Sequence, residues 1–252
     1  MVSSDQTSRA EPRWPAVIAI IAVVALRFSL PQALRFGPDW ILAPVVGLLL
    51  VSTMVLHQWR RYRANQILGC ILLAVVTAEM IARVALLITR LPGHRDTPRQ
   101  LLTAALGIWW SNVLIFASWY WRLDSGGPNA RDRRRSHDSG ALLFPQMQMR
   151  NQNWKPGFVD YLFLAFNTST AFSPTDVPVL SRWAKAMMIV QSCISLGTVF
   201  FLALVRRTFS KEGNAQPLKK ETLSGISRAM GTTCRSISSG YRGLDSGLTR
   251  AE

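Results

Sequence analysis

The hydrophobic residues of this chain are gathered in long blocks, and its charged residues lie mostly between or after those blocks. A soluble domain would spread its apolar residues at helical or strand period, whereas runs of about 18 or more match the thickness of a bilayer core. The blocks are Trp14 to Leu34, Trp40 to Leu56, Ile67 to Leu91, Leu101 to Trp121 and Ala186 to Val205. The pattern predicts an all-α integral membrane protein with about five transmembrane helices.

Two of these blocks end in aromatic residues beside arginines, at Trp59 to Arg63 and at Trp119 to Arg122. Such ends are typical of the boundary between hydrocarbon and headgroups. For the first block a secretory signal peptide is the alternative, because Arg9 and Arg13 precede it. No small-residue cleavage site follows Leu26, and another hydrophobic block comes at once, so a membrane span is favoured.

A shorter segment, Phe158 to Asp176, is mixed in character. As a helix, Phe158 to Phe172 would extend about 22 Å, which is short of a bilayer core of about 30 Å. Its second half is rich in hydroxyls, and Pro174 stops the helix. Polar, irregular backbone is tolerated at membrane depth only inside protein or water, so the segment predicts a re-entrant, pore-like half-helix. The pore-like residues are Asn167, Thr168, Ser169, Thr170, Ser173, Pro174, Thr175 and Asp176.

These patterns divide the chain into five regions. They are an N-terminal segment (1–13), a four-helix membrane region (14–122), a polar basic loop (123–157), the half-helix with the last transmembrane helix (158–207) and a basic tail (208–252). The tail is rich in Ser, Gly, Lys and Arg with few large apolar residues, which predicts disorder.

The formal net charge is +15, with 49% hydrophobic and 17% charged residues. Basic chains often bind nucleic acid, but a basic tail beside hydrophobic spans is better explained by anionic lipid and by orientation in the membrane. The lipid bilayer is therefore the expected partner, and nucleic acid is not. The three cysteines and three histidines show no metal-ligand spacing, so neither a metal nor another cofactor is expected.

Glu79 and Arg83 are ionisable residues four positions apart inside the third block, so they share one helix face. Ionisable groups in a span usually face the bundle interior or a water-filled cavity. An internal ion pair that fixes helix packing is one interpretation, and an element of an ion or proton path is the other.

In the last block Gln191, Ser195 and Thr198 recur at helical spacing and form a polar stripe, with Gly197 beside it. Membrane bundles commonly place small and polar residues where helices touch. The alternative is that the stripe lines a pore and that Gly197 gives it a flexible point.

The order of outer span, short helix, polar turn ending in Asp and inner span resembles the pore domain of potassium channels. Thr168, Thr170 and Asp176 match positions of the channel pattern T-x-T-x-x-G-Y-G-D. Ser, Pro and Thr at 173–175 replace its Gly-Tyr-Gly. Selectivity depends there on a row of backbone carbonyls, in a conformation that glycine makes accessible and proline does not. The turn is therefore expected not to form a potassium-selective filter.

The chain also resembles a family of uncharacterised bacterial membrane proteins, a domain of unknown function. The likeness rests on the aromatic-rich span Asn112 to Tyr120, the Phe-Pro pair at 144–145, and an Asp-Tyr-Leu-Phe-Leu-Ala-Phe segment that begins at Asp160. It covers roughly residues 112–207 and implies a multi-pass protein of the bacterial inner membrane, without implying an activity.

Two arguments give different numbers of spans, and the length argument is preferred because a polar segment as short as 158–176 cannot cover the bilayer core. Length and polarity favour five spans with a half-helix at 158–176. The positive-inside rule instead favours six, because the basic loops and the tail then fall on one side.

The leading function hypothesis is a channel-like or transport-related membrane protein. The rival is a non-conducting structural or regulatory subunit that keeps the pore-domain fold. No paired catalytic carboxylates, histidine cluster, G-x-S-x-G or phosphate-binding loop is present, so no catalytic residues and no enzyme activity are expected. A homo-oligomer whose copies surround a central axis would favour the channel.

Overall fold

The structure is a computed structural model, and it describes residues 11–28, 39–90, 98–133, 140–148, 154–170 and 177–205. The chain divides into two compact units, 1–203 and 204–252, and all but the last two of the described residues belong to the first. The predicted site residues Ser173, Pro174, Thr175 and Asp176 and the predicted disordered tail lie outside the described residues.

The described part is helical, and its single element of β pairing is an isolated antiparallel bridge between Leu142 and Val179. The longer helices are α1 (Trp14–Phe28), α2 (Asp39–Gln58), α3 (Tyr62–Arg90), α4 (Pro98–Leu123), α7 (Phe158–Thr170) and an unlabelled helix, Arg182–Val205, called here the 182–205 helix. The short elements are η3 (Asp124–Gly126), α5 (Pro128–Arg133) and α6 (Pro145–Gln148). The all-helical prediction is therefore confirmed for this part of the chain.

Three segments are long and apolar enough to cross a membrane: Tyr62–Thr89, Arg99–Gly126 and Arg182–Val205. The apolar stretches of α1 and α2, Trp14–Arg27 and Ala43–Gln58, are shorter. Of the roughly five spans that the sequence predicts, three are therefore supported in the described part.

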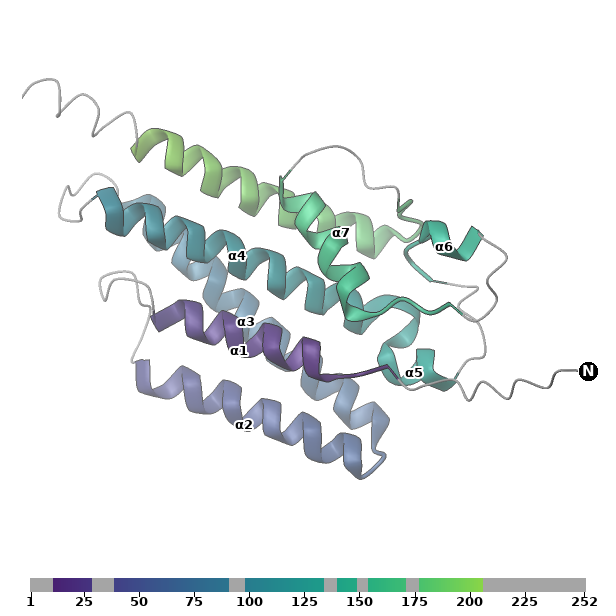
Figure 1. The fold of residues 1–252 in the computed structure, drawn as a ribbon. Helices are drawn as coiled ribbons and strands as arrows, with labels where there is room; N and C mark the ends of the chain where they lie inside the picture. The colour runs from purple at the N-terminus through teal and green to yellow at the C-terminus, as the bar shows by residue number, and fades with distance from the viewer. Residues whose placement is uncertain are drawn as a thin grey trace, which may run out of the picture. The chain divides into compact units, whose positions relative to one another are not determined.

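Helix α4 is the central helix of the bundle, because α1, α3 and α7 all pack against it, while α2 packs against α3 (Figure 1). Its apolar side chains are buried on several sides, as expected for a helix surrounded by others. Buried positions of α4 include Ala104, Ala105, Ile108, Val113, Ile115, Phe116 and Ala117.

One end of the bundle, the polar end, brings together the starts of α1 and α3 with the ends of α2 and α4. Gln66 Nε2 donates a hydrogen bond to the carbonyl oxygen of Arg122 at 2.7 Å, which joins α3 to α4. Trp121 Nε1 donates to Glu11 Oε1 at 2.6 Å, which joins α4 to the residues just before α1. Consecutive helices therefore alternate in direction.

Helix α7 begins at this polar end, and the chain lies at the polar end again by residue 180. Tyr161 OH donates to Asp124 Oδ2 at 2.7 Å. After the undescribed residues 171–176, Leu180 N donates to the carbonyl oxygen of Ala141 at 2.8 Å. Ala141 N in turn donates to Asp124 Oδ1 at 2.7 Å. Both ends of the segment 158–180 are therefore tied to the surroundings of one carboxylate.

Candidate functional site

Three ionisable residues inside the apolar helices form one group. Glu79 Oε1 accepts a hydrogen bond from Arg83 Nε at 2.6 Å and another from Arg27 Nη1 at 2.6 Å. All three side chains are buried, with Arg27 only 1% exposed. The structure thus places Glu79 beside Arg83 in α3 and adds Arg27 from α1. In the sequence, Arg27 stands out only because it interrupts the first apolar block.

The polar stripe of the 182–205 helix is buried against other helices of the same chain. Tyr120 OH donates to Gln191 Oε1 at 2.6 Å. Gln191 Nε2 donates to the carbonyl oxygen of Ala165 and to Ser169 Oγ, both at 2.7 Å. Every polar atom of the Gln191 amide is therefore engaged by α4 or α7, and its side chain is fully buried.

The other two stripe residues are also buried, Ser195 at 3% and Thr198 at 2% exposure. Asn112 Nδ2 donates to Ser195 Oγ at 2.9 Å and to the carbonyl oxygen of Gln191 at 3.1 Å. Thr198 Oγ1 donates to the carbonyl oxygen of Ile194 one turn earlier. Asn112 is a residue that sequence reasoning placed in a span without a role, and the structure makes it the partner of the stripe.

The described pore-like residues lie at the end of α7, and their hydroxyls bond within the protein. Thr168 Oγ1 donates to the carbonyl oxygen of Leu164 at 2.8 Å, and Thr170 Oγ1 donates to that of Phe166 at 3.1 Å. Ser169 Oγ accepts from Gln191, as described above. Asn167 is half-buried. The structure thus brings Ser169 to the polar stripe and leaves the threonine hydroxyls on their own helix.

A second buried network holds the polar end together. Arg131 Nη1 donates to the carbonyl oxygens of Trp121 at 2.8 Å and Asp124 at 3.0 Å, and its Nη2 donates to Glu11 Oε2 at 3.1 Å. Its guanidinium also lies 5.1 Å from the ring centroid of Tyr161. The hydrophilic pattern of residues 123–157 predicted a polar loop, because a buried arginine and a solvated one look alike in such a stretch.

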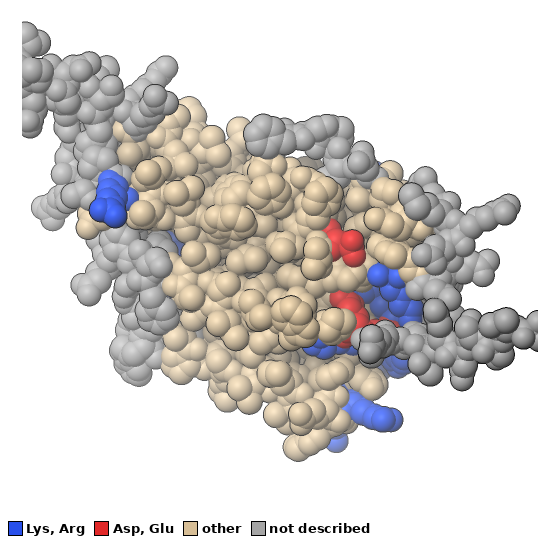
Figure 2. All heavy atoms as spheres, in the orientation of Figure 1, with Lys and Arg blue, Asp and Glu red and all other residues tan. Residues whose placement is uncertain are grey.

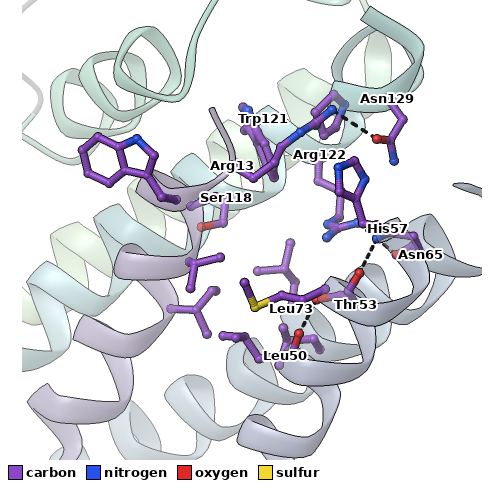
Figure 3. Close-up of a pocket in the computed structure, with 18 of the residues that line it drawn as sticks. Arg13, Leu50, Thr53, His57, Asn65, Leu73, Ser118, Trp121, Arg122 and Asn129 are labelled. Carbon is purple, nitrogen blue, oxygen red and sulfur yellow. Dashed lines mark hydrogen bonds between the residues drawn. The ribbon is translucent and has the colours of Figure 1, made fainter. Parts of the chain in front are cut away.

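A cavity of about 320 Å³ lies between α1, α2, α3 and α4 near the polar end (Figure 3). Apolar side chains form its walls, including Ile20, Leu50, Met54, Leu72 and Leu73. Polar side chains line it toward the polar end, namely Arg13, His57, Asn65, Arg122 and Asn129. The cavity is therefore amphipathic, with its cationic groups at one end.

The two arginines of the cavity differ in their partners. Arg13 forms an ion pair with Asp132 and donates to Asn129 Oδ1 at 3.1 Å. Burial lowers the pKa of the Arg13 guanidinium, while the carboxylates of Asp132 and Glu11 raise it. Arg122 Nη1 donates to the carbonyl oxygen of Asn65 at 3.1 Å and to its Oδ1 at 3.3 Å. Among the described residues, no carboxylate forms an ion pair with Arg122.

Most charged side chains visible on the face in Figure 2 lie near the end of the bundle at which α5 is found. The wide surface beside them is made by uncharged residues. The bundle exposes large apolar side chains, which include Ile18, Leu48, Ile67, Phe163, Leu196 and Phe200.

Within the described ranges, no group of three or more His, Cys, Asp or Glu side chains is placed to hold a metal ion. Comparison with family models, with curated protein sequences and with solved structures finds no match to this chain.

Proposed function

We propose that this chain is a multi-pass protein of the bacterial inner membrane, in which five helices cross the bilayer and α7 is re-entrant. Large apolar side chains stay exposed on every long helix, a pattern that lipid tails would stabilise and water would not. With 13 residues, α7 extends about 20 Å, which is shorter than a bilayer core of about 30 Å. Its return to the polar end after residue 176 supports the re-entrant arrangement.

Membrane integration is tested by carbonate extraction of membranes from cells that express the chain. The protein should stay in the pellet with integral membrane proteins. Recovery in the supernatant would contradict integration, because carbonate releases only peripheral proteins.

Of the two function hypotheses, we propose the non-conducting structural or regulatory subunit. The observation that supports it is the use of Gln191: one amide satisfies Tyr120, Ala165 and Ser169 at once. A pore-lining amide would turn its polar atoms toward water and ions. Here the stripe joins α4, α7 and the 182–205 helix, which is the usual use of polar residues in membrane bundles.

The exposed side chains of the 182–205 helix also support a non-conducting subunit. After Arg182 and Lys185 in its first turn, the large side chains that it exposes are apolar, namely Ile189, Val190, Leu196, Val199 and Phe200. These residues suit contact with lipid tails or with another apolar helix. A channel whose path ran along this face of the helix would be lined by apolar side chains.

The test is ion flux into liposomes that carry the purified full-length protein. Potassium and sodium should enter no faster than they enter protein-free liposomes, with an ionophore as the positive control. Flux of both ions would support the channel-like alternative. A strong preference for potassium would further show that Ser173, Pro174 and Thr175 build a selective filter.

A further inference from the structure

The cavity between α1, α2, α3 and α4 has the chemistry of a lipid site. Its volume of about 320 Å³ lies in the range of ligand pockets, which begin at about 300 Å³. Its inner walls are aliphatic, and its arginines lie at the polar end. A ligand that suits it has a hydrocarbon chain at one end and a negative charge at the other.

The cavity is bordered by side chains that are exposed on α1 and α2. Trp14 is 64% exposed, Ile18 54% and Met54 51%, and all three line the cavity. In the proposed membrane orientation, these apolar side chains meet lipid tails. An acyl chain can therefore enter sideways from the bilayer without passing through water.

The depth of the charged end fits a lipid headgroup. Trp14 and Trp59, the latter 71% exposed, lie at the same end of the bundle as Arg122. Exposed tryptophans favour the interface between hydrocarbon and headgroups. Arg122 near the end of α4 is thus placed where lipid phosphates lie.

Arg122 retains hydrogen-bonding capacity for such a phosphate. Its hydrogen bonds to described residues use only Nη1, which leaves Nε and Nη2 as donors. Gly69 of α3 makes room for the guanidinium, because a Cβ at that position would overlap it. Arginine binds phosphate through paired N–H donors, and the apolar surroundings strengthen the attraction.

We propose that this cavity binds one molecule of an anionic phospholipid, with its phosphate at Arg122 and one acyl chain between α1 and α2. Arg13 adds positive charge at the same end, although Asp132 already engages it. The site is separate from the Gln191 contacts, so it does not depend on whether the protein conducts ions.

The experiment uses the purified full-length protein in an uncharged detergent. Phosphatidylglycerol and phosphatidylcholine with identical chains are titrated in parallel, and the unfolding temperature is followed at each concentration. Phosphatidylglycerol should raise the unfolding temperature in a saturable way, since a ligand that binds the folded state stabilises it. Phosphatidylcholine should give a smaller shift at every concentration.

Arg122→Gln should raise the half-saturating concentration of phosphatidylglycerol about tenfold or more, the loss expected for a charge-assisted hydrogen bond. Arg63→Gln is the matched control, because Arg63 is an exposed arginine at the same end of the bundle and does not line the cavity. It should change the half-saturating concentration less than about twofold.

A second pair of variants leaves the arginines of the cavity unchanged and adds a bulky side chain inside or outside the cavity. Leu50→Trp adds bulk at the cavity wall and should abolish the phosphatidylglycerol shift, whereas Val51→Trp, on the exposed face of the same helix, should preserve it. Three results would each overturn the proposal: equal shifts with both lipids, unchanged binding by Arg122→Gln and Leu50→Trp, or an equal shift with soluble glycerol 3-phosphate. The last result would identify a site for a small anion without an acyl chain.

Discussion

Arg27 of α1 donates a hydrogen bond to Glu79 of α3 at 2.6 Å, across 52 positions of sequence. Arg83, one turn along α3, donates to the same carboxylate oxygen. The two helices make few other contacts with each other, since α1 packs mainly on α4. The buried carboxylate of Glu79 therefore ties α1 to α3.

Glu79→Gln is expected to lower the free energy of unfolding by about 3–5 kcal/mol, as when a buried ion pair loses one partner. Arg83→Ala should cost less, because Glu79 keeps the hydrogen bond from Arg27. Unfolding of the purified protein in mixed micelles with increasing denaturing detergent measures both values.

The pairing itself is tested by a double-mutant cycle. Arg27→Gln combined with Glu79→Gln should cost less than the sum of the two single changes. Ile88→Val, an exposed position of α3, is the control and should stay within about 0.5 kcal/mol of the unaltered protein. Additive costs at Arg27 and Glu79 would show that no energetic coupling joins them.

The sequence predicted some of this arrangement and missed the rest for a physical reason. Spacing along one helix fixes which residues share a face, so Glu79 and Arg83 could be placed together in advance. The partner on another helix depends on which helices touch, and apolar blocks of similar composition do not reveal that order. Arg27 was therefore visible only as an interruption of a span.

The same limit applies to the polar stripe and to the polar end. The spacing of Gln191, Ser195 and Thr198 gave one helix face but left open whether water or protein covers it. Asp124 and Arg131 were assigned to a solvated loop because hydrophilic residues beyond a span usually are solvated. Their burial follows from tertiary contacts with Tyr161, Ala141 and the residues before α1, which local pattern does not encode.

Gln191→Leu should lower the free energy of unfolding by about 1–3 kcal/mol, because the Tyr120 hydroxyl and the Ser169 hydroxyl lose a buried partner. Tyr120→Phe should cost less in the Gln191→Leu background than in the unaltered protein. Val190→Ala, at the exposed neighbouring position, serves as the control in the same detergent titration. Equal effects of Tyr120→Phe in both backgrounds would argue against the contact.

The re-entrant arrangement of α7 makes a prediction about sidedness. In a chain with Cys70, Cys193 and Cys234 replaced by serine, single cysteines at Lys155 and Leu180 should react with a membrane-impermeant maleimide from the same side. A cysteine at Thr89, near the far end of α3, should react from the other side. Labelling of intact spheroplasts and of inverted vesicles measures this. Reaction of positions 155 and 180 from opposite sides would instead favour the six-span arrangement.

The turn after α4 requires glycine at position 127, and this requirement can be measured. Gly127 has a φ of +87°, and a Cβ there would lie 2.7 Å from the carbonyl oxygen of Arg122 and 2.8 Å from Gln66 Oε1. Gly127→Ala should therefore lower the free energy of unfolding by about 1–3 kcal/mol, the cost of a strained backbone.

Gly47 offers a matched control inside α2, because a Cβ there meets no atom within 4 Å. Gly47→Ala should raise the free energy of unfolding by about 0.5–1 kcal/mol, since alanine favours the helix. If Gly127→Ala is as stable as Gly47→Ala, then the turn does not hold α4 against α3 in the way that the Gln66–Arg122 hydrogen bond implies.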